Sequence, residues 1–120
     1  MSANLPYRCP ACGNQIIAGQ TICSCGADLT LLQRLDMIAD AWFNRGLRAQ
    51  ADGEPGQALE WFSACCAARP GDAEARLAQA KTWGQLGRRK EALRTLQLAR
   101  DINPDLPGIA DTEQALNEEA

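Results

Sequence analysis

The longest regular pattern of apolar positions begins near Thr30, where large hydrophobic residues recur every three or four positions. These residues are Leu31, Leu35, Ile38 and Trp42. Their spacing is typical of one face of an α-helix. Thr30 and Gln33 also match a capping box, in which a hydroxyl and a side-chain amide satisfy free backbone N–H groups at a helix start. The pattern therefore predicts a helix from Thr30 to about Gln50.

From this helix onward, the chain aligns with itself when one copy is shifted along the other by 34 residues. The aligned pairs are Gly53 with Gly87, Ala58 with Ala92, Leu59 with Leu93, and Pro70 with Pro104. Each unit contains two helical segments and ends at a proline, which cannot continue a helix. We therefore expect two antiparallel helix pairs, at about residues 39–72 and 73–106. A last helix at about residues 108–119 has Ile109 and Leu116 on one side, as suits a solvated end helix.

The residue types at the repeated positions resemble the tetratricopeptide repeat, which has the same period. The pattern is matched by Trp42, Gly46, Ala58, Phe62 and Pro70, and then by Ala80, Trp83, Ala92, Leu96 and Pro104. Arg76 and Gln79 depart from it, which suggests that the first helix of the second unit is less buried or that these side chains serve a surface. The resemblance implies a mainly α-helical solenoid of antiparallel helix pairs; the alternative is an unrelated pair of α-hairpins.

Four of the six cysteines lie within residues 1–28, and the composition becomes helix-forming for residues 29–120. The four are Cys9, Cys12, Cys23 and Cys25, and each pair is followed by glycine. Two tight turns of this kind can direct four thiolates at one ion, and glycine tolerates the bend. The arrangement resembles a zinc ribbon, with a β-hairpin expected from strands at residues 15–17 and 20–22. Its second pair is C-x-C, one residue shorter than the usual C-x2-C.

A segment as small as residues 1–28 has almost no core, so a bound metal would supply much of its folding free energy. Four thiolates complete the coordination of zinc and leave no position for water, which implies one structural zinc ion and no hydrolysis. Iron can occupy a similar site. A thiol-based redox sensor is a further alternative, because the same cysteines can form disulfides. We expect Cys65 and Cys66 to be core residues, since neighbours on a helix point about 100° apart.

Composition and charge narrow the classes of function. The chain has no histidine, which removes the commonest general base, and we expect it not to be an enzyme. A net charge of −3 and a predicted ribbon with Arg8 as its one basic residue argue against nucleic acid, although a transcription-associated accessory is an alternative. No apolar run approaches the roughly 20 residues that span a bilayer. We therefore expect no membrane insertion, a cytoplasmic location and reduced thiols.

In tetratricopeptide arrays, the first helix of each pair lines a concave surface that binds peptides. By this resemblance, the lining is expected to be Phe43, Asn44, Leu47 and Gln50, followed by Leu77 and Lys81. Its apolar centre favours an apolar or amphipathic protein segment, unless the chain's own ribbon or end helix covers it. Trp61 is expected either to contact a partner or to pack on the ribbon. Together these features predict a non-catalytic adaptor, a scaffold or a small subunit of a larger complex.

Overall fold

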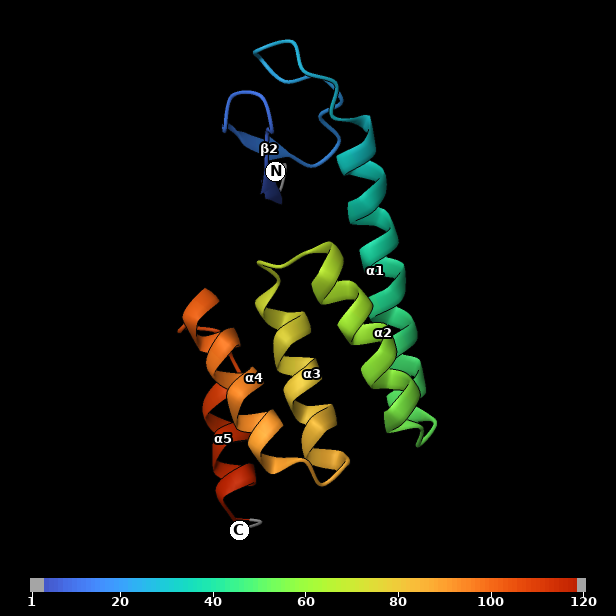
Figure 1. Ribbon diagram of the computed structural model, residues 1–120, viewed down its shortest axis with the longest axis vertical. Coiled ribbons are helices and arrows are strands. Elements are labelled where there is room, and N and C mark those ends of the chain that lie inside the picture. The colour runs from blue at the N-terminus through green and yellow to red at the C-terminus, as the bar shows by residue number, and fades with distance from the viewer. Residues whose placement is uncertain (1–3, 119–120) are drawn as a thin grey trace.

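A computed structural model describes residues 4–118 as a small ribbon followed by helices (Figure 1). Of residues 4–6 only the backbone is described. Residues 1–3 begin the expected ribbon part (1–28), and residues 119–120 end the expected helical part (29–120). These five residues lie outside the described residues. The molecule measures 53 × 27 × 24 Å, and the ribbon occupies one end of its long axis.

The ribbon contains an antiparallel pair of strands, β1 (Asn4–Arg8) and β2 (Gln15–Ile17). Strand β2 lies where the sequence predicts one. Its partner is β1, however, and the prediction of a strand at residues 20–22 is wrong. The chain reverses between β1 and β2 through the first cysteine pair, where the backbone N–H of Cys9 donates to the Asn14 carbonyl at 2.9 Å.

Side chains explain why no strand at residues 20–22 pairs with β2. The backbone N–H of Ile17 donates to the side-chain oxygen of Gln20 at 3.0 Å, and the Gln20 carbonyl accepts from the side-chain amide of Gln33 at 2.7 Å. The turn keeps the bond from the Gln20 N–H to the Ile17 carbonyl, at 3.0 Å, but these side chains occupy the two groups of the next backbone bond that a returning strand would need. The chain instead continues to an isolated bridge between Ile22 and Asp28.

The helices of the described part repeat with the period that the sequence predicts. They are α1 (Thr30–Ala51), α2 (Pro55–Ala68), α3 (Ala73–Gln85), α4 (Arg89–Ile102) and α5 (Ile109–Glu118). The shift that aligns Gly53 with Gly87 also relates both ends of α2 to those of α4, and the end of α1 to the end of α3. The turns match as well, because these two glycines have φ angles of 76° and 77°, a conformation that glycine adopts readily.

Matched pairs of small and large residues bring the helices together. In the first pair, a Cβ atom built on Gly46 would lie 2.5 Å from Cε1 of Phe62. In the second pair, the equivalent residues are Ala80 and Leu96, which are 0% and 2% exposed in one apolar cluster. A leucine fills less space than a phenylalanine, so the second pair has room for the alanine methyl group.

Helix α3 is not the less buried helix that Arg76 and Gln79 suggested, because it lies between α2 and α4 (Figure 1). Its buried residues are Ala73, Ala75, Leu77, Ala78, Ala80 and Thr82. The two unusual residues instead form a polar connection to α2. Arg76 donates to the side-chain oxygen of Gln79 at 3.3 Å, and the Gln79 amide donates to Ser63 Oγ at 3.0 Å.

The predicted capping box at the start of α1 is wrong. The Thr30 hydroxyl donates backwards to Asp28 Oδ1 at 2.7 Å, and Gln33 points into the ribbon. The partners of the Gln33 amide are the carbonyls of Ile17 (3.1 Å) and Gln20 (2.7 Å) and the N–H of Gly19 (3.0 Å). These bonds leave the Gln33 side chain unable to cap the helix, and they fasten the ribbon to α1.

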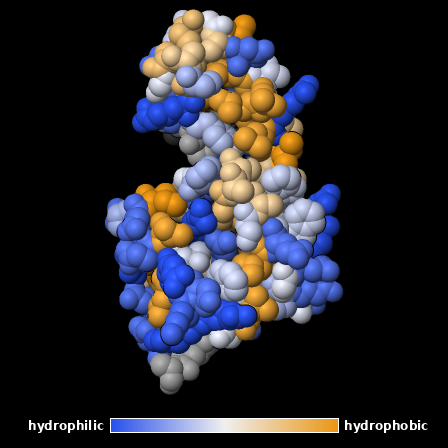
Figure 2. Space-filling view, viewed as in Figure 1, coloured by the Kyte–Doolittle hydropathy of each residue, from blue (hydrophilic) through white to orange (hydrophobic). Residues whose placement is uncertain are grey.

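The apolar stripe of α1 is covered unevenly. Leu31 is 76% exposed and Ile38 is 44% exposed, because the last turn of α2 packs near Ala39 and leaves the first turns of α1 beyond its end. Figure 2 shows hydrophobic surface gathered over this N-terminal half of α1. Even this helix, at 22 residues, is not apolar enough for a membrane span, and no other helix of the described part qualifies.

Candidate metal centre

The four cysteines of the ribbon converge on one point. The Sγ atoms of Cys9, Cys12, Cys23 and Cys25 all lie within 4.8 Å of one another. Two short separations join the two cysteine pairs, at 3.7 Å between Cys9 and Cys25 and 3.5 Å between Cys12 and Cys23. With Zn–S bonds of about 2.3 Å, a regular tetrahedron places its sulfurs about 3.8 Å apart. The observed separations are therefore close to those of a four-thiolate metal site.

Two glycine-ended turns set this geometry. The N–H of Gly13 donates to the Cys9 carbonyl at 2.8 Å, four residues back, and both turns end on a glycine with positive φ. In the shorter C-x-C pair, the N–H of Gly26 donates to the Cys23 carbonyl at 2.8 Å, three residues back. The second turn is thus one residue tighter than the first, and both sulfurs of the C-x-C pair still face the cluster.

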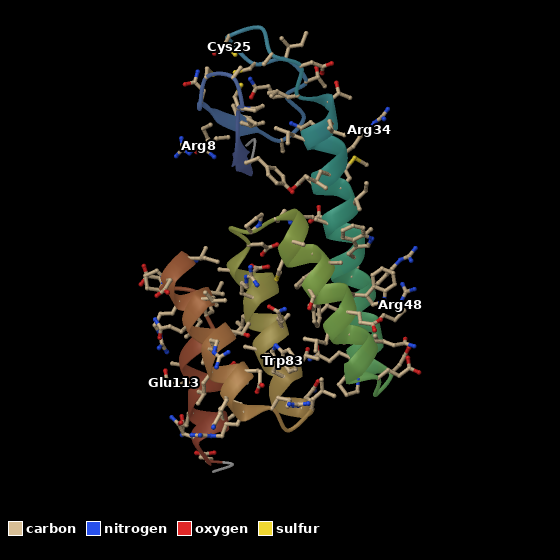
Figure 3. The ribbon with its side chains drawn as sticks, in the orientation of Figure 1. Arg8, Cys25, Arg34, Arg48, Trp83 and Glu113 are labelled. Atoms are coloured by element: carbon tan, nitrogen blue, oxygen red, sulfur yellow. The ribbon has the colours of Figure 1, made fainter. Side chains whose placement is uncertain are left out.

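Two of the four cysteines belong to the core of the ribbon, and the other two lie on its surface. Cys9 and Cys23 are 2% and 4% exposed and pack with Ile16 and Leu29, whereas Cys12 and Cys25 are exposed. Figure 3 shows Cys25 at the end of the ribbon that points away from the helices. A core of two cysteines and two aliphatic residues is small for an independent fold, so a ligand that ties the four sulfurs together would stabilise it.

The electrostatics of the thiols also favour a cation. The backbone N–H of Cys25, together with the neighbouring thiols, lowers the pKa of Cys23 to about 6. The N–H of Asn14 lowers the pKa of Cys12, but partial desolvation and the three neighbouring sulfurs outweigh it and raise that pKa to about 12. Without a cation, negative charge on one sulfur therefore keeps another protonated. A divalent metal removes this conflict, because each of its ligands is a thiolate.

Cys65 and Cys66 lie apart from this cluster, in the core between α1, α2 and α3. They are 0% and 2% exposed and pack with Ala39 and Ala75. Burial raises the pKa of the Cys66 thiol to about 11, and burial is also the main cause of the raised pKa of Cys65. Both therefore serve as packing groups.

Most residues expected to line a concave surface do lie around one hollow, of about 300 Å³. Its walls are Phe43, Leu47, Gln50, Glu74, Leu77, Ala78, Lys81, Leu106 and Pro107. Asn44 is exposed but is not part of these walls. Leu106 and Pro107, from the α4–α5 connection, border the hollow without closing it, since Leu47 is 43% exposed. The ribbon is not part of these walls either.

A second hollow, of about 420 Å³, adjoins the first because Gln50 and Lys81 line both. Its other walls are Gly84, Gln85, Gly108, Asp111, Thr112, Ala115 and Leu116. The two hollows follow α3, with α1 on one side and α5 on the other, and we call them together the α3 trough. The sequence predicts the end helix and allows it as a cover of the concave surface, but it does not predict that α5 forms one wall of a second hollow.

Trp61 lies away from both the ribbon and the α3 trough. The guanidinium carbon of Arg45 lies 5.0 Å from the centre of the indole ring, within the range of a cation–π contact. The half-buried ring also borders a hollow beside Asp52 and Glu54, near the end of α1 opposite the ribbon. Of the two alternatives for Trp61, packing on the ribbon is therefore wrong, and contact with a partner stays a prediction.

Comparison with protein-family models gives no match for this chain, and comparison with curated proteins gives none either. The geometry of the cysteine cluster and of the α3 trough must therefore carry the functional conclusion.

Proposed function

We propose that this protein is a non-catalytic adaptor in which a zinc ribbon is joined to a short tetratricopeptide-like array. The single observation that carries the proposal is the convergence of four cysteine sulfurs within 4.8 Å. Four protein ligands complete the tetrahedral coordination of zinc, whereas catalytic zinc keeps one position for water. We therefore assign the ion a structural role and choose zinc over iron, because small four-cysteine ribbons are characteristic zinc sites.

The α3 trough supports a peptide as the partner. From Glu74 to Gln85 it follows 11 residues of rise along α3, about 17 Å, which equals about five residues of extended chain. Leu47 and Leu77 offer apolar contacts in the first hollow, and Lys81, which lines both hollows, offers a cation beside them. We propose that the partner contributes an amphipathic segment, whose apolar side packs on the leucines and whose polar side faces Lys81, Glu74 and Asp111.

The experiment is affinity capture of the zinc-loaded protein from its native host, followed by direct binding of the recovered partner. Leu47→Asp places a charge in the trough, and Leu98→Asp is the matched control, because Leu98 is 45% exposed on α4 and lines neither hollow. We expect Leu47→Asp to lose the partner and Leu98→Asp to retain it. Equal recovery with both variants, or equal loss with both, would exclude the trough as the binding surface.

The cysteine geometry favours redox sensing as a second candidate function. Each close cross-pair combines one exposed and one buried cysteine, Cys25 with Cys9 and Cys12 with Cys23. One molecule of hydrogen peroxide would take two electrons from each thiolate pair, forming one S–S bond. Its two oxygens leave as two water molecules with protons from solvent, and the metal is released. Peptide mass spectrometry after mild peroxide treatment should then find Cys9–Cys25 and Cys12–Cys23 disulfides together with zinc loss. Retention of zinc with six unmodified cysteines would reject this candidate.

A further inference from the structure

The ribbon touches the helical array at a junction made by three side chains. Leu32 of α1 packs on the ribbon core, and the Gln33 amide holds the turn at residues 17–20. The Tyr7 hydroxyl of β1 donates to the carbonyl of Ala68 at 2.7 Å, across 61 positions of sequence. Figure 1 shows the ribbon above the connection between α2 and α3, where this bond is made.

The Tyr7 bond satisfies a group that the helix itself leaves free. Ala68 is the last residue of α2, and the final carbonyls of a helix have no partner within it. The next residue, Arg69, is buried and binds α1 and α3 at once. It contacts Asp36 at 3.2 Å, Asp40, and Asp72 at 3.0 Å. Asp72 in turn caps α3 by accepting the N–H of Ala75 at 3.0 Å.

In the second repeat, the positions equivalent to Ala68 and Arg69 have no ribbon beside them. One period later, Asn103 replaces Arg69 and Leu106 replaces Asp72, so the charged junction is not repeated. Ile102, which corresponds to Ala68, is 39% exposed at the end of α4. The contacts around Ala68 and Arg69 are therefore a feature of the ribbon end of the molecule and not of the repeat itself.

The position of Tyr7 depends on the cysteine cluster. It lies in β1 just before Cys9, and β1 is held beside β2 by the first cysteine turn. The turn to which Gln33 is hydrogen-bonded is followed directly by the second cysteine pair. The Tyr7 and Gln33 contacts are thus both made by ribbon segments that the four sulfurs tie together.

We propose that the metal-filled ribbon is the cap of the helical array, and that metal loading at the four cysteines controls the order of the junction between α1, α2 and α3. This inference rests on the proposed zinc site. When the metal leaves, Tyr7 and Gln33 lose their fixed positions. The first turns of α1 then fray, because Leu31 and Ile38 are already exposed and a short unpacked helix is marginal in water.

Hydrogen–deuterium exchange of the full chain, with and without zinc, tests this proposal. Removal of zinc by a chelator should speed exchange about tenfold in residues 30–38 and 64–72, and leave residues 89–118 unchanged. Faster exchange confined to residues 7–28, or equal acceleration throughout, would overturn the coupling even if zinc is bound. Failure to bind zinc, measured on the same samples, would instead reject the proposed site and the coupling with it.

A variant separates the junction from the metal. Tyr7→Phe removes only the hydroxyl that bonds Ala68, so the zinc-loaded variant should keep one zinc and exchange faster in residues 64–72. Ile22→Ala is the matched ribbon control, because Ile22 is 66% exposed and its side chain lies outside the junction. We expect this control to behave as the native protein. Unchanged exchange in Tyr7→Phe, or the same acceleration in Ile22→Ala, would contradict the role of Tyr7.

Discussion

Replacement of Gly46 by alanine should destabilise the first helix pair, because the added methyl group would overlap the ring of Phe62. The new Cβ would lie 2.5, 2.7 and 2.9 Å from three ring carbons, about 1 Å inside normal carbon contact. Phe62 is 0% exposed, so the ring has no open space to enter. Overpacking of this kind costs roughly 3 kcal/mol, and the helix preference of alanine over glycine returns about 1 kcal/mol. We expect a net loss of about 2 kcal/mol.

The second repeat suggests the substitution that should rescue this variant. At the equivalent positions, Ala80 and Leu96 pack together in one buried cluster. Phe62→Leu alone should cost about 1 kcal/mol through the space it leaves. Combined with Gly46→Ala, it makes the room that the methyl group needs. The double variant should therefore be more stable than the sum of the single changes predicts, with a coupling energy of about 2 kcal/mol.

The assay is equilibrium unfolding in urea, followed by far-UV circular dichroism, on the zinc-loaded native protein, both single variants and the double variant. Gly56→Ala is the control, since it also replaces a helical glycine but its new Cβ would have no neighbour within 4 Å. We expect this control to be neutral or slightly stabilised. Additive single changes, within about 0.5 kcal/mol, would refute the matched packing of the two repeats. Equal stability of Gly46→Ala and Gly56→Ala would refute the overlap itself.

Three further predictions concern other parts of the molecule. Chelation should make four thiols react quickly with a thiol reagent, while Cys65 and Cys66 react more slowly, because both are buried and burial raises the pKa of Cys66 to about 11. Arg69→Ala should lower the free energy of unfolding in urea by about 3 kcal/mol, because it leaves three carboxylates without their shared cation. Arg88→Ala, which removes an exposed ion pair, should change the same quantity by less than about 0.5 kcal/mol. Burial and the Asp36 carboxylate raise the pKa of Tyr7 to about 12, so the neutral phenol's contribution to stability should be complete below pH 10 and be lost as the pH rises toward 12. Urea unfolding at a series of pH values checks this, because the free energy of unfolding should fall less between pH 10 and pH 12 in Tyr7→Phe than in the native protein.

The features that the sequence predicts well are those set by short-range rules. The spacing of the cysteines and the glycines that follow them selects the residues of the cluster, since each tight turn needs only its own backbone. Proline at positions 70 and 104, and glycine at 53 and 87, mark helix ends by steric rules that hold wherever they occur. The period of the helix pairs then follows without any knowledge of the packing.

The features that the sequence misses depend on contacts between distant residues. Gln33 matches a capping box locally, but its three partners lie 13 to 16 residues earlier, in the ribbon. The same side chain occupies the Gln20 carbonyl, and the Gln20 side chain occupies the Ile17 N–H, so residues 20–22 form no strand beside β2. The Tyr7 bond to Ala68 spans 61 positions, and the α5 wall of the trough follows from packing that no motif encodes.

The most direct test of the account is the metal content of the intact protein, measured by native mass spectrometry and elemental analysis. We predict one zinc per chain in the native protein, retained in Cys65→Ala and lost in a Cys12→Ser, Cys23→Ser double variant. A chain that carries no metal, that carries iron, or that keeps its zinc when Cys12 and Cys23 are replaced would contradict the four-cysteine zinc site.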